Sequence, residues 1–229
     1  MFKAILYDWN GGNLWLFHAI NDLRGPVLDR FMLVGTQIGD YALFPVYLAL
    51  AVLTATLVSA HATVIDPKQD QQLAVRWLIT LSILCVASLL DGAFLTWAKH
   101  WFDYPRPLLA LPQGSVNVVG EAEYRRSLPS GHASFAMLIA ASLWPMLGNR
   151  QRWAAVFFVI WVGASRVNVG AHFPADVLAS WLTALPAVML TRAIVGRCLA
   201  VVSAVRQRRP PPRHQPSTGR RDTNPAKGD

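Results

Sequence analysis

The sequence predicts an all-α, integral-membrane helical bundle with about five transmembrane helices. Of its 229 residues, 53% are hydrophobic and only 15% are charged, and the apolar residues gather in long runs. That balance is unusual for a soluble enzyme and typical of a membrane protein. The candidate spans are residues 41–60, 73–98, 131–148, 153–169 and 173–195. Because spanning a bilayer takes about 20 apolar residues, we expect the third and fourth spans to be tilted or partly interfacial.

The segment before the first span is expected to form N-terminal interfacial helices. Residues 13–39 interleave apolar side chains with charged and amide ones, a pattern typical of amphipathic helices at a membrane surface. A break is expected at Gly25 and Pro26, and a sixth span in this segment is the alternative. The first residues become polar too early for a cleavable signal peptide. We therefore divide the chain into an interfacial segment (1–40), a transmembrane catalytic bundle (41–198) and a basic tail (199–229).

The net charge of +8 does not point to nucleic acid as a partner, because much of it lies in the tail. From Arg206 to Asp229 there are seven Lys or Arg residues and two acidic ones. A basic segment beside apolar spans is typical of a cytoplasmic tail that contacts anionic lipid. The tail is also rich in proline and polar residues, so we expect it to be disordered.

Basic residues in short loops set the orientation of the bundle. Arg150 and Arg152 lie between the third and fourth spans. With five spans, this loop and the basic tail fall on the same side of the membrane, which is therefore cytoplasmic. The connections 99–130 and 170–172 then face outward. We expect a bacterial inner-membrane protein with a site on the periplasmic side.

Three polar clusters lie at the ends of spans, and all of them fall on the outward side. They are residues 99–107 (KHWFDYPRP), 129–132 (PSGH) and 165–176 (SRVNVGAHFPAD). The first follows the second span and the next opens the third. The last joins the end of the fourth span to the start of the fifth. The connectivity therefore brings the three clusters to one membrane face and predicts a site there.

The cations of these clusters are suited to a doubly charged anion. Lys99, Arg106 and Arg166 are expected near the membrane surface. Two helices begin on the same face, and their N-termini present backbone N–H groups and positive dipole ends. Ser130 can cap its helix or donate to a phosphate oxygen, and Gly131 lets the backbone come close.

Two histidines supply groups that can react. A neutral imidazole can attack phosphorus if its other N–H is held, and Asp176 is placed four residues beyond His172 to hold it. His132 is then the candidate acid that protonates the departing oxygen. No cluster of acidic residues suited to Mg²⁺ accompanies them. We therefore expect no metal and no other cofactor, with the cations neutralising the charge directly.

Asp91 is an acid inside the second span, about 12 Å from Lys99 at 1.5 Å per residue. At such depth an acid is a functional candidate. We expect it to be a partner of one of the site cations, and the alternative is an acid exposed to a hydrated cavity. Taken singly, every residue of the clusters also has an ordinary interpretation, such as an interfacial lysine or a helix cap. Their joint order and spacing favour the site.

The three clusters resemble the motifs of the type 2 phosphatidic acid phosphatase family without a departure. They read K-x6-R-P from Lys99, P-S-G-H from Pro129 and S-R-x5-H-x3-D from Ser165. The resemblance extends from Lys99 to Asp176, about a third of the chain. That family includes soluble vanadium haloperoxidases, which the five spans disfavour here.

The resemblance implies a phosphatase with a histidine nucleophile. His172 would form a phosphohistidine, Asp176 would orient it, and His132 would protonate the leaving group. The implied phosphate-binding residues are Lys99, Arg106, Ser130, Gly131 and Arg166.

We therefore expect hydrolysis of a phosphomonoester or diphosphate of a membrane lipid, with the lipid and the bilayer as partners. Undecaprenyl diphosphate, phosphatidylglycerol phosphate and lipid A phosphates all suit the site. Residues 108–127, which include Glu121 and Glu123, are expected to form part of its rim. One alternative is a phosphotransferase that passes the phosphoryl group to another lipid. The other is a non-catalytic lipid binder or transporter.

Overall fold

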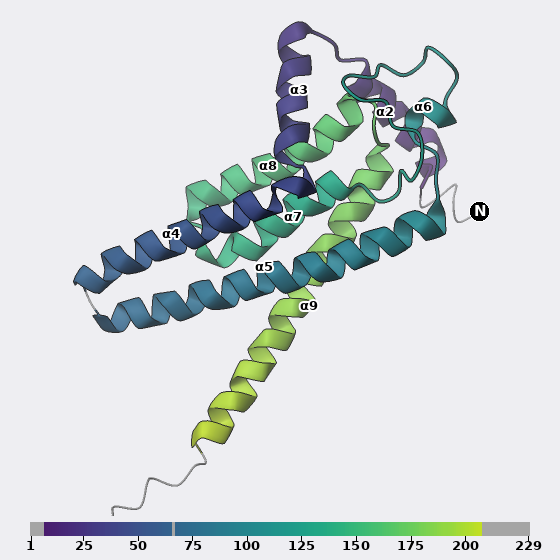
Figure 1. The fold of residues 1–229 in the computed structure, drawn as a ribbon. Helices are drawn as coiled ribbons and strands as arrows, with labels where there is room; N and C mark the ends of the chain where they lie inside the picture. The colour runs from purple at the N-terminus through teal and green to yellow at the C-terminus, as the bar shows by residue number, and fades with distance from the viewer. Residues whose placement is uncertain (1–6, 66, 208–229) are drawn as a thin grey trace, which may run out of the picture. The chain divides into compact units, whose positions relative to one another are not determined.

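The computed structural model describes residues 7–65 and 67–207. Within those residues the chain contains helices and loops but no β-strand, which confirms the predicted all-α class (Figure 1). The chain divides into two units, Met1–Val195 and Gly196–Asp229. The α-helices are α2 (Gly12–Asn21), α3 (Pro26–Ile38), α4 (Phe44–Ile65), α5 (Pro67–Phe102), α6 (Pro107–Ala110), α7 (Gly131–Leu143), α8 (Asn149–Asn168) and α9 (Pro174–Gln207).

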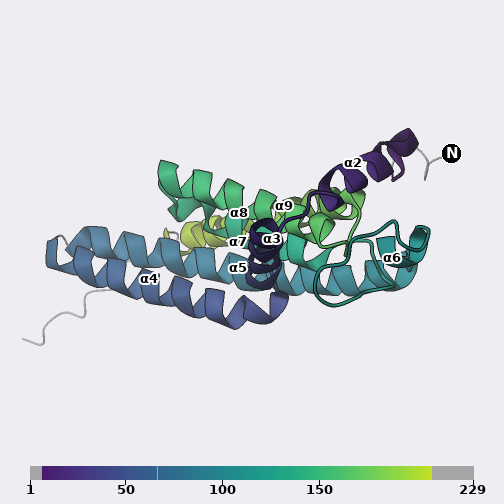
Figure 2. The ribbon, with the colours of Figure 1, turned by 90° about the horizontal axis from the view of Figure 1, so that it is seen from above.

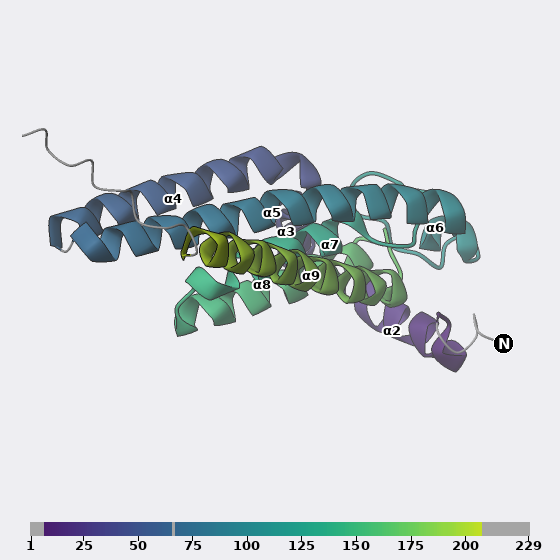
Figure 3. The same ribbon diagram turned by 90° about the horizontal axis from the view of Figure 1, so that it is seen from below.

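Helices α4 and α5 form a hairpin in the first unit, and they lie side by side in all three ribbon views (Figures 1, 2 and 3). Their outer faces expose large apolar side chains, among them Leu50 and Leu57 of α4 and Leu78 and Leu89 of α5. A soluble protein rarely leaves so much contiguous apolar surface in water. These faces are instead suited to contact with lipid chains.

Within the described residues, three helical segments are long and apolar enough to cross a membrane: Tyr41–Ala62, Gln71–Ala110 and Pro174–Val201. The other two predicted spans are also helices. However, α7 has 13 residues and is therefore about 20 Å long, less than the ~30 Å of a hydrocarbon core. Helix α8 is longer, but Arg150 and Arg152 reduce the apolar character of its first turn. The membrane bundle is confirmed, and five remains the predicted number of spans.

The short helix α7 lies between three neighbours. Its Leu138 packs with Ile83 of α5 and Val188 of α9, and its Ala136 packs with Val162 of α8. A helix surrounded in this way does not need a full-length apolar face toward lipid. The N-terminal end of α7, which carries the P-S-G-H cluster, is consequently held by core packing on several sides.

The N-terminal segment folds as two short helices that are broken just before Pro26, as predicted. Helix α3 packs against α8, with Phe31 stacked on Trp161 at 4.4 Å between ring centroids. Helix α2 buries Phe17 completely, against Phe173. The described part of segment 1–40, predicted to be interfacial, therefore also packs on the helices that carry the polar clusters.

In the second unit, α9 continues as a helix through Gln207. Residues 199–207, which we assigned to a disordered tail, are therefore helical. Their sequence, LAVVSAVRQ, stays mostly apolar and free of helix breakers, and the first proline comes only at position 210. The rest of the predicted tail, residues 208–229, lies outside the described residues.

Candidate active site

His172 lies in the short loop between α8 and α9. Its Nδ1 is 3.3 Å from Oδ2 of Asp176 in the first turn of α9, and both side chains are buried. The end of α8 fixes this loop, because the backbone N–H groups of Ala171 and His172 both donate to the Arg166 carbonyl at 3.1 Å. A proton on Nδ1 that is donated to the carboxylate leaves the lone pair on Nε2, as a nucleophile requires.

The Asp176 carboxylate accepts hydrogen bonds from several segments of the chain. Its Oδ1 accepts from the hydroxyl of Tyr7 at 2.9 Å. Its Oδ2 accepts from the backbone N–H of Phe173 at 2.9 Å and from the hydroxyl of Ser127. Such donors stabilise a buried carboxylate in its charged form and fix its orientation toward His172. We predicted neither Tyr7 nor Ser127 as site residues.

Arg106 and Arg166 are the two buried arginines of the site, with 6% and 3% of their surfaces exposed. Nη1 of Arg106 lies 3.1 Å from both the Ala171 carbonyl and Nε2 of His172. Its Nε donates to the Arg125 carbonyl at 2.9 Å. A guanidinium remains charged even when buried, so these two residues create a site that requires an anion.

Glu123, in the loop between α6 and α7, connects the two arginines. Its Oε2 is 2.7 Å from Nη1 of Arg106, and its Oε1 is 2.6 Å from Nη2 of Arg166. Burial alone would raise the pKa of Glu123, but the two guanidiniums outweigh it and lower the pKa. We predicted Glu123 only as part of a rim. The structure places its carboxylate directly between two of the predicted phosphate-binding residues.

The start of α7 contributes further donors. Ser130 is fully buried, does not cap its own helix, and its hydroxyl has no hydrogen-bond partner among the described residues. Nε of Arg166 is buried without a partner in the same way. The ammonium of Lys99 lies 4.0 Å from where a Cβ on Gly131 would be. Unpaired buried donors are costly, and a bound anion would satisfy them.

His132 is the less buried histidine, with 24% of its side chain exposed. Its Nε2 lies 4.0 Å from Oδ2 of Asp40, the residue that precedes the first apolar span. The other oxygen of Asp40 accepts the backbone N–H of Ala42 at 2.8 Å. His132 therefore faces the beginning of the α4 segment, a neighbour that its position in the sequence does not reveal.

The electrostatic surroundings of His172 show that the predicted clusters meet. Burial lowers the pKa of His172 well below its ordinary value of 6.5, and Arg106, Arg166, Lys99 and His132 lower it further. All four neighbours were predicted as members of the same site. A lowered pKa keeps the imidazole neutral at pH 7, the form that can act as a nucleophile.

Asp91 does not have the partner that we predicted. Ser134 on α7 donates to its Oδ2 at 2.7 Å, and none of the ion pairs among the described residues joins Asp91 to a site cation. The reason is its depth, about 12 Å from Lys99 along α5. Ser134 is two residues beyond His132, so the bond ties α5 to the part of α7 just below the P-S-G-H cluster.

Asparagines hold the N-terminal segment against the loops around the site. The buried side-chain amide of Asn21 donates to the carbonyls of Asn117 and Asn168, both at 2.8 Å. Asn168 in turn donates to the Ile20 carbonyl at 2.9 Å. Because Asn168 ends α8 close to Arg166, these bonds help to position the site. The presence of amide side chains in an otherwise apolar helix such as α2 is the sequence feature that could have indicated this positioning role.

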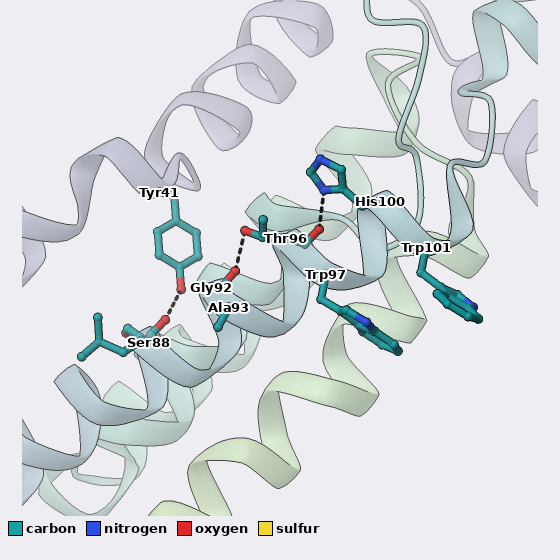
Figure 4. Close-up of a pocket in the computed structure, with 9 residues that line it drawn as sticks. Tyr41, Ser88, Gly92, Ala93, Thr96, Trp97, His100 and Trp101 are labelled. Carbon is teal, nitrogen blue, oxygen red and sulfur yellow. Dashed lines mark hydrogen bonds between the residues drawn. The ribbon is translucent and has the colours of Figure 1, made fainter.

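A cavity of about 810 Å³ runs along α5 (Figure 4). Figure 4 shows Trp97 and Trp101 projecting on the same side of α5, with their rings stacked at 6.0 Å between centroids. The Tyr41 hydroxyl donates to the Ser88 carbonyl at 3.2 Å. The lining is mostly apolar and comprises Tyr41, Ser88, Leu89, Gly92, Ala93, Thr96, Trp97, His100 and Trp101.

The family model of the PAP2 superfamily matches residues 80–218. Lipid A 1-phosphatase of Rhizobium johnstonii is 38% identical over 71 residues, which are 29% of this chain and 29% of that protein. Undecaprenyl-diphosphatase BcrC of Bacillus subtilis is 28% identical over 176 residues, which are 76% of this chain and 79% of BcrC. The chain thus matches less than a third of the length of the first relative and most of the second.

The fold is similar to a solved structure, that of LpxE from Aquifex aeolicus. The TM-score is 0.61 at 25% sequence identity, covering 78% of this chain and 93% of LpxE. The similarity therefore extends over most of this chain and nearly all of LpxE. Together with the family match, it confirms the resemblance that the three motifs indicated.

Proposed function

Because the chain belongs to the PAP2 superfamily, we propose that it is a membrane lipid phosphatase that works through a phosphohistidine on His172. The observation that carries this proposal is the state of His172. Its lowered pKa favours a neutral imidazole, Oδ2 of Asp176 lies 3.3 Å from one ring nitrogen, and Nη1 of Arg106 lies 3.1 Å from the other.

In the first step, Nε2 of His172 attacks phosphorus while the bond from phosphorus to the lipid oxygen breaks. His132 gives a proton to that oxygen. The proton on Nδ1 of His172 stays there, hydrogen-bonded to Asp176. Lys99, Arg106, Arg166, the Ser130 hydroxyl and the backbone N–H groups at Gly131 stabilise the charge on the transferring phosphoryl group.

In the second step, water attacks the phosphohistidine. His132, now neutral, accepts a proton from the water, the nitrogen–phosphorus bond breaks, and phosphate leaves. A lipid diphosphate would react in the same way at its terminal phosphorus, with the bridging oxygen as the leaving group. No step in this sequence requires a metal.

The lipid part of the proposal is supported by the apolar spans and by the cavity along α5. Tyr41 in the cavity wall adjoins Asp40, which lies 4.0 Å from His132, the proposed proton donor to the leaving lipid. The lipid chain would therefore extend along α5 while its phosphate sits among the cations. The named relatives act on lipid A and on undecaprenyl diphosphate, and both belong to this chemical class.

We further propose that the site faces the periplasm of a bacterium and that the bundle 41–198 forms the catalytic unit. The segment 1–40 would lie at the membrane surface, and residues 208–229, which follow α9, would face the cytoplasm. These assignments rest on the positions of the basic loops.

Phosphate release by the purified protein in detergent tests the function. The substrates would be undecaprenyl diphosphate, phosphatidylglycerol phosphate and lipid A, with transfer to a labelled acceptor lipid measured in parallel. We expect free phosphate from at least one lipid, activity that survives chelators, and no activity in His172→Ala. Full activity in that variant would contradict the mechanism, and transfer without release would make the protein a phosphotransferase.

A further inference from the structure

The anion site of this protein already contains an anion of its own. The Glu123 carboxylate places one oxygen on Arg106 and the other on Arg166, at 2.7 and 2.6 Å. Two oxygens that bridge two guanidiniums are what a bound phosphate would also present to them. Glu123 and a substrate phosphate therefore cannot both make these contacts.

We propose that Glu123 is a specificity-determining gate, an internal anion that a phosphomonoester or terminal diphosphate displaces and a phosphodiester headgroup does not. This inference rests on the proposed function. A monoester group offers up to two negative charges and three terminal oxygens, whereas a diester offers one charge and two oxygens, no more than the carboxylate itself. Exchange of Glu123 for a diester would gain nothing, while exchange for a dianion gains a charge and an acceptor.

Such a gate would solve a problem that the location of the site creates. A pocket of three cations at a membrane surface is surrounded by phosphodiester lipids at far higher concentration than any substrate. Without a competitor, these headgroups would occupy Arg106 and Arg166 for much of the time. The carboxylate keeps the pocket closed to them.

The side chain of Glu123 is free to leave, whereas the arginines are not. Its side chain is 36% exposed, compared with 7% for Arg106 and 4% for Arg166. The backbone beside it is anchored, because the Tyr124 carbonyl accepts the Arg106 N–H and the Arg125 carbonyl accepts Arg106 Nε, both at 2.9 Å. Opening therefore needs a rotation of one side chain toward water and no movement of the loop.

Displacement would also bear on the nucleophile. Nη1 of Arg106 contacts both Oε2 of Glu123 and Nε2 of His172, the latter at 3.1 Å. While the gate is closed, the two N–H groups of Nη1 face three acceptors: the Glu123 carboxylate, the Ala171 carbonyl and the lone pair that must attack phosphorus. A substrate phosphate that takes over Arg106 would draw these N–H groups to its own oxygens.

The gate is tested first by binding, without any turnover. Orthovanadate and inorganic phosphate would be titrated calorimetrically into the full-length protein in detergent micelles. If the open state is about a tenth of the population, Glu123→Gln should bind both anions about tenfold more tightly. Glu123→Asp, which keeps the charge, should stay close to the unaltered protein, and so should Glu121→Gln at the exposed neighbouring acid.

The opposite sign would overturn the proposal. If Glu123 only holds the two arginines in place and does not compete with phosphate, Glu123→Gln should bind phosphate more weakly or equally. The variant would then lose the support of the carboxylate and gain no free site. Thermal unfolding of each variant shows whether the pocket is folded. If Glu123→Gln does not fold, Glu123→Ala, which also removes the carboxylate, takes its place in both assays with the same expected results.

Selectivity is tested by kinetics in mixed micelles. Phosphatidylglycerol, a phosphodiester lipid with one charge, should raise the KM of Glu123→Gln for a monoester lipid several-fold and leave the unaltered protein unaffected. In its absence, the KM of Glu123→Gln should fall with little change in kcat. Equal inhibition of both proteins would refute the selectivity. Tighter phosphate binding in a protein that hydrolyses no lipid would support the gate and refute the proposed function.

Discussion

Among individual residues, the buried carboxylate of Asp176 shows how the site depends on distant parts of the chain. It is held by Tyr7, 169 residues away, and by Ser127, 49 residues away. Both donors stabilise the charged carboxylate, which lies 3.3 Å from Nδ1 of His172 and can hold a proton there. The proposed catalytic geometry therefore includes residues that belong to none of the three motifs.

Removal of one of these donors should slow the reaction without preventing substrate binding. A hydrogen bond to a buried charged group is worth about 1.5–3 kcal/mol, so we expect Tyr7→Phe to lower kcat by at least about tenfold and to leave KM nearly unchanged. Tyr124→Phe, at an exposed tyrosine, is the matched control and should have no effect. Equal kcat in both variants would show that Tyr7 does not position Asp176.

The protonation of His172 gives a pH prediction. Burial, followed by Arg106 and Arg166, lowers its pKa well below 6.5, so the imidazole should stay neutral from about pH 8 to below pH 6.5. The unfolded chain takes up this proton near its ordinary pKa, so the folded state should lose stability as the pH falls below 6.5. In NMR spectra of ¹⁵N-histidine-labelled protein, the signal of His172 is the one that is lost in His172→Asn. This signal should show no titration centred near pH 6.5, and such a titration would refute the neutral nucleophile.

The motif residues could be predicted because their chemistry is tied to a fixed spacing in the sequence. Lys99, Ser130 and Arg166 each follow or precede an apolar run, and the alternation of spans brings these ends together. Glu123 and Ser127 have no such signal, since they lie in an irregular loop whose path depends on tertiary contacts. The partner of Asp91 was wrong because depth in a span predicts a polar contact but not which neighbouring helix supplies it.

At the scale of helices, the site depends on the close approach of α8 and α9, which carry Arg166 and Asp176. At their crossing, a Cβ on Gly163 would lie 2.6 Å from the Trp181 ring and 2.8 Å from a Val177 methyl. Only a residue without a side chain lets the two helices come this close. The distance between the arginine and the carboxylate thus depends on a glycine one turn away from the chemistry.

A methyl group at this crossing should destabilise the protein. We expect Gly163→Ala to cost about 1–3 kcal/mol through overpacking and to lower both Tm and kcat. Gly196→Ala in α9 is the matched control, because its added Cβ would meet nothing within 4 Å and alanine favours a helix by up to ~1 kcal/mol. The Tm values of the two variants, measured by thermal unfolding in detergent, should therefore shift in opposite directions. An unchanged Tm in Gly163→Ala would show that the crossing can relax.

The existence of the five main helices followed from their apolar runs, but their lengths did not. Helix α7 is shorter than a full span because core packing replaces lipid on its faces. Helix α9 is longer than predicted, since its apolar sequence continues past the point where we placed the tail. Hydropathy reports how apolar a segment is, and it does not distinguish a protein neighbour from a lipid one.

For the whole molecule, the proposed function requires that the loops around the site lie on the outer side of the membrane. Labelling with a membrane-impermeant maleimide tests this in spheroplasts, after replacement of the free cysteines Cys85 and Cys198. A cysteine at Glu121 should react in intact spheroplasts, and one at Arg150 only after permeabilisation. Reaction of both from outside would show that α7 does not cross, and the reverse pattern would invert the orientation.

The central claim is that His172 becomes phosphorylated during turnover, and mass spectrometry can detect this directly. His132→Ala should slow hydrolysis of the intermediate more than its formation when p-nitrophenyl phosphate, whose leaving group needs little protonation, is the substrate. After an alkaline quench, the peptide of His132→Ala that contains His172 should carry one phosphoryl group. The same peptide from Asp176→Asn should be phosphorylated to a much smaller extent. Turnover of this substrate with His172 unmodified at every time point would contradict the account.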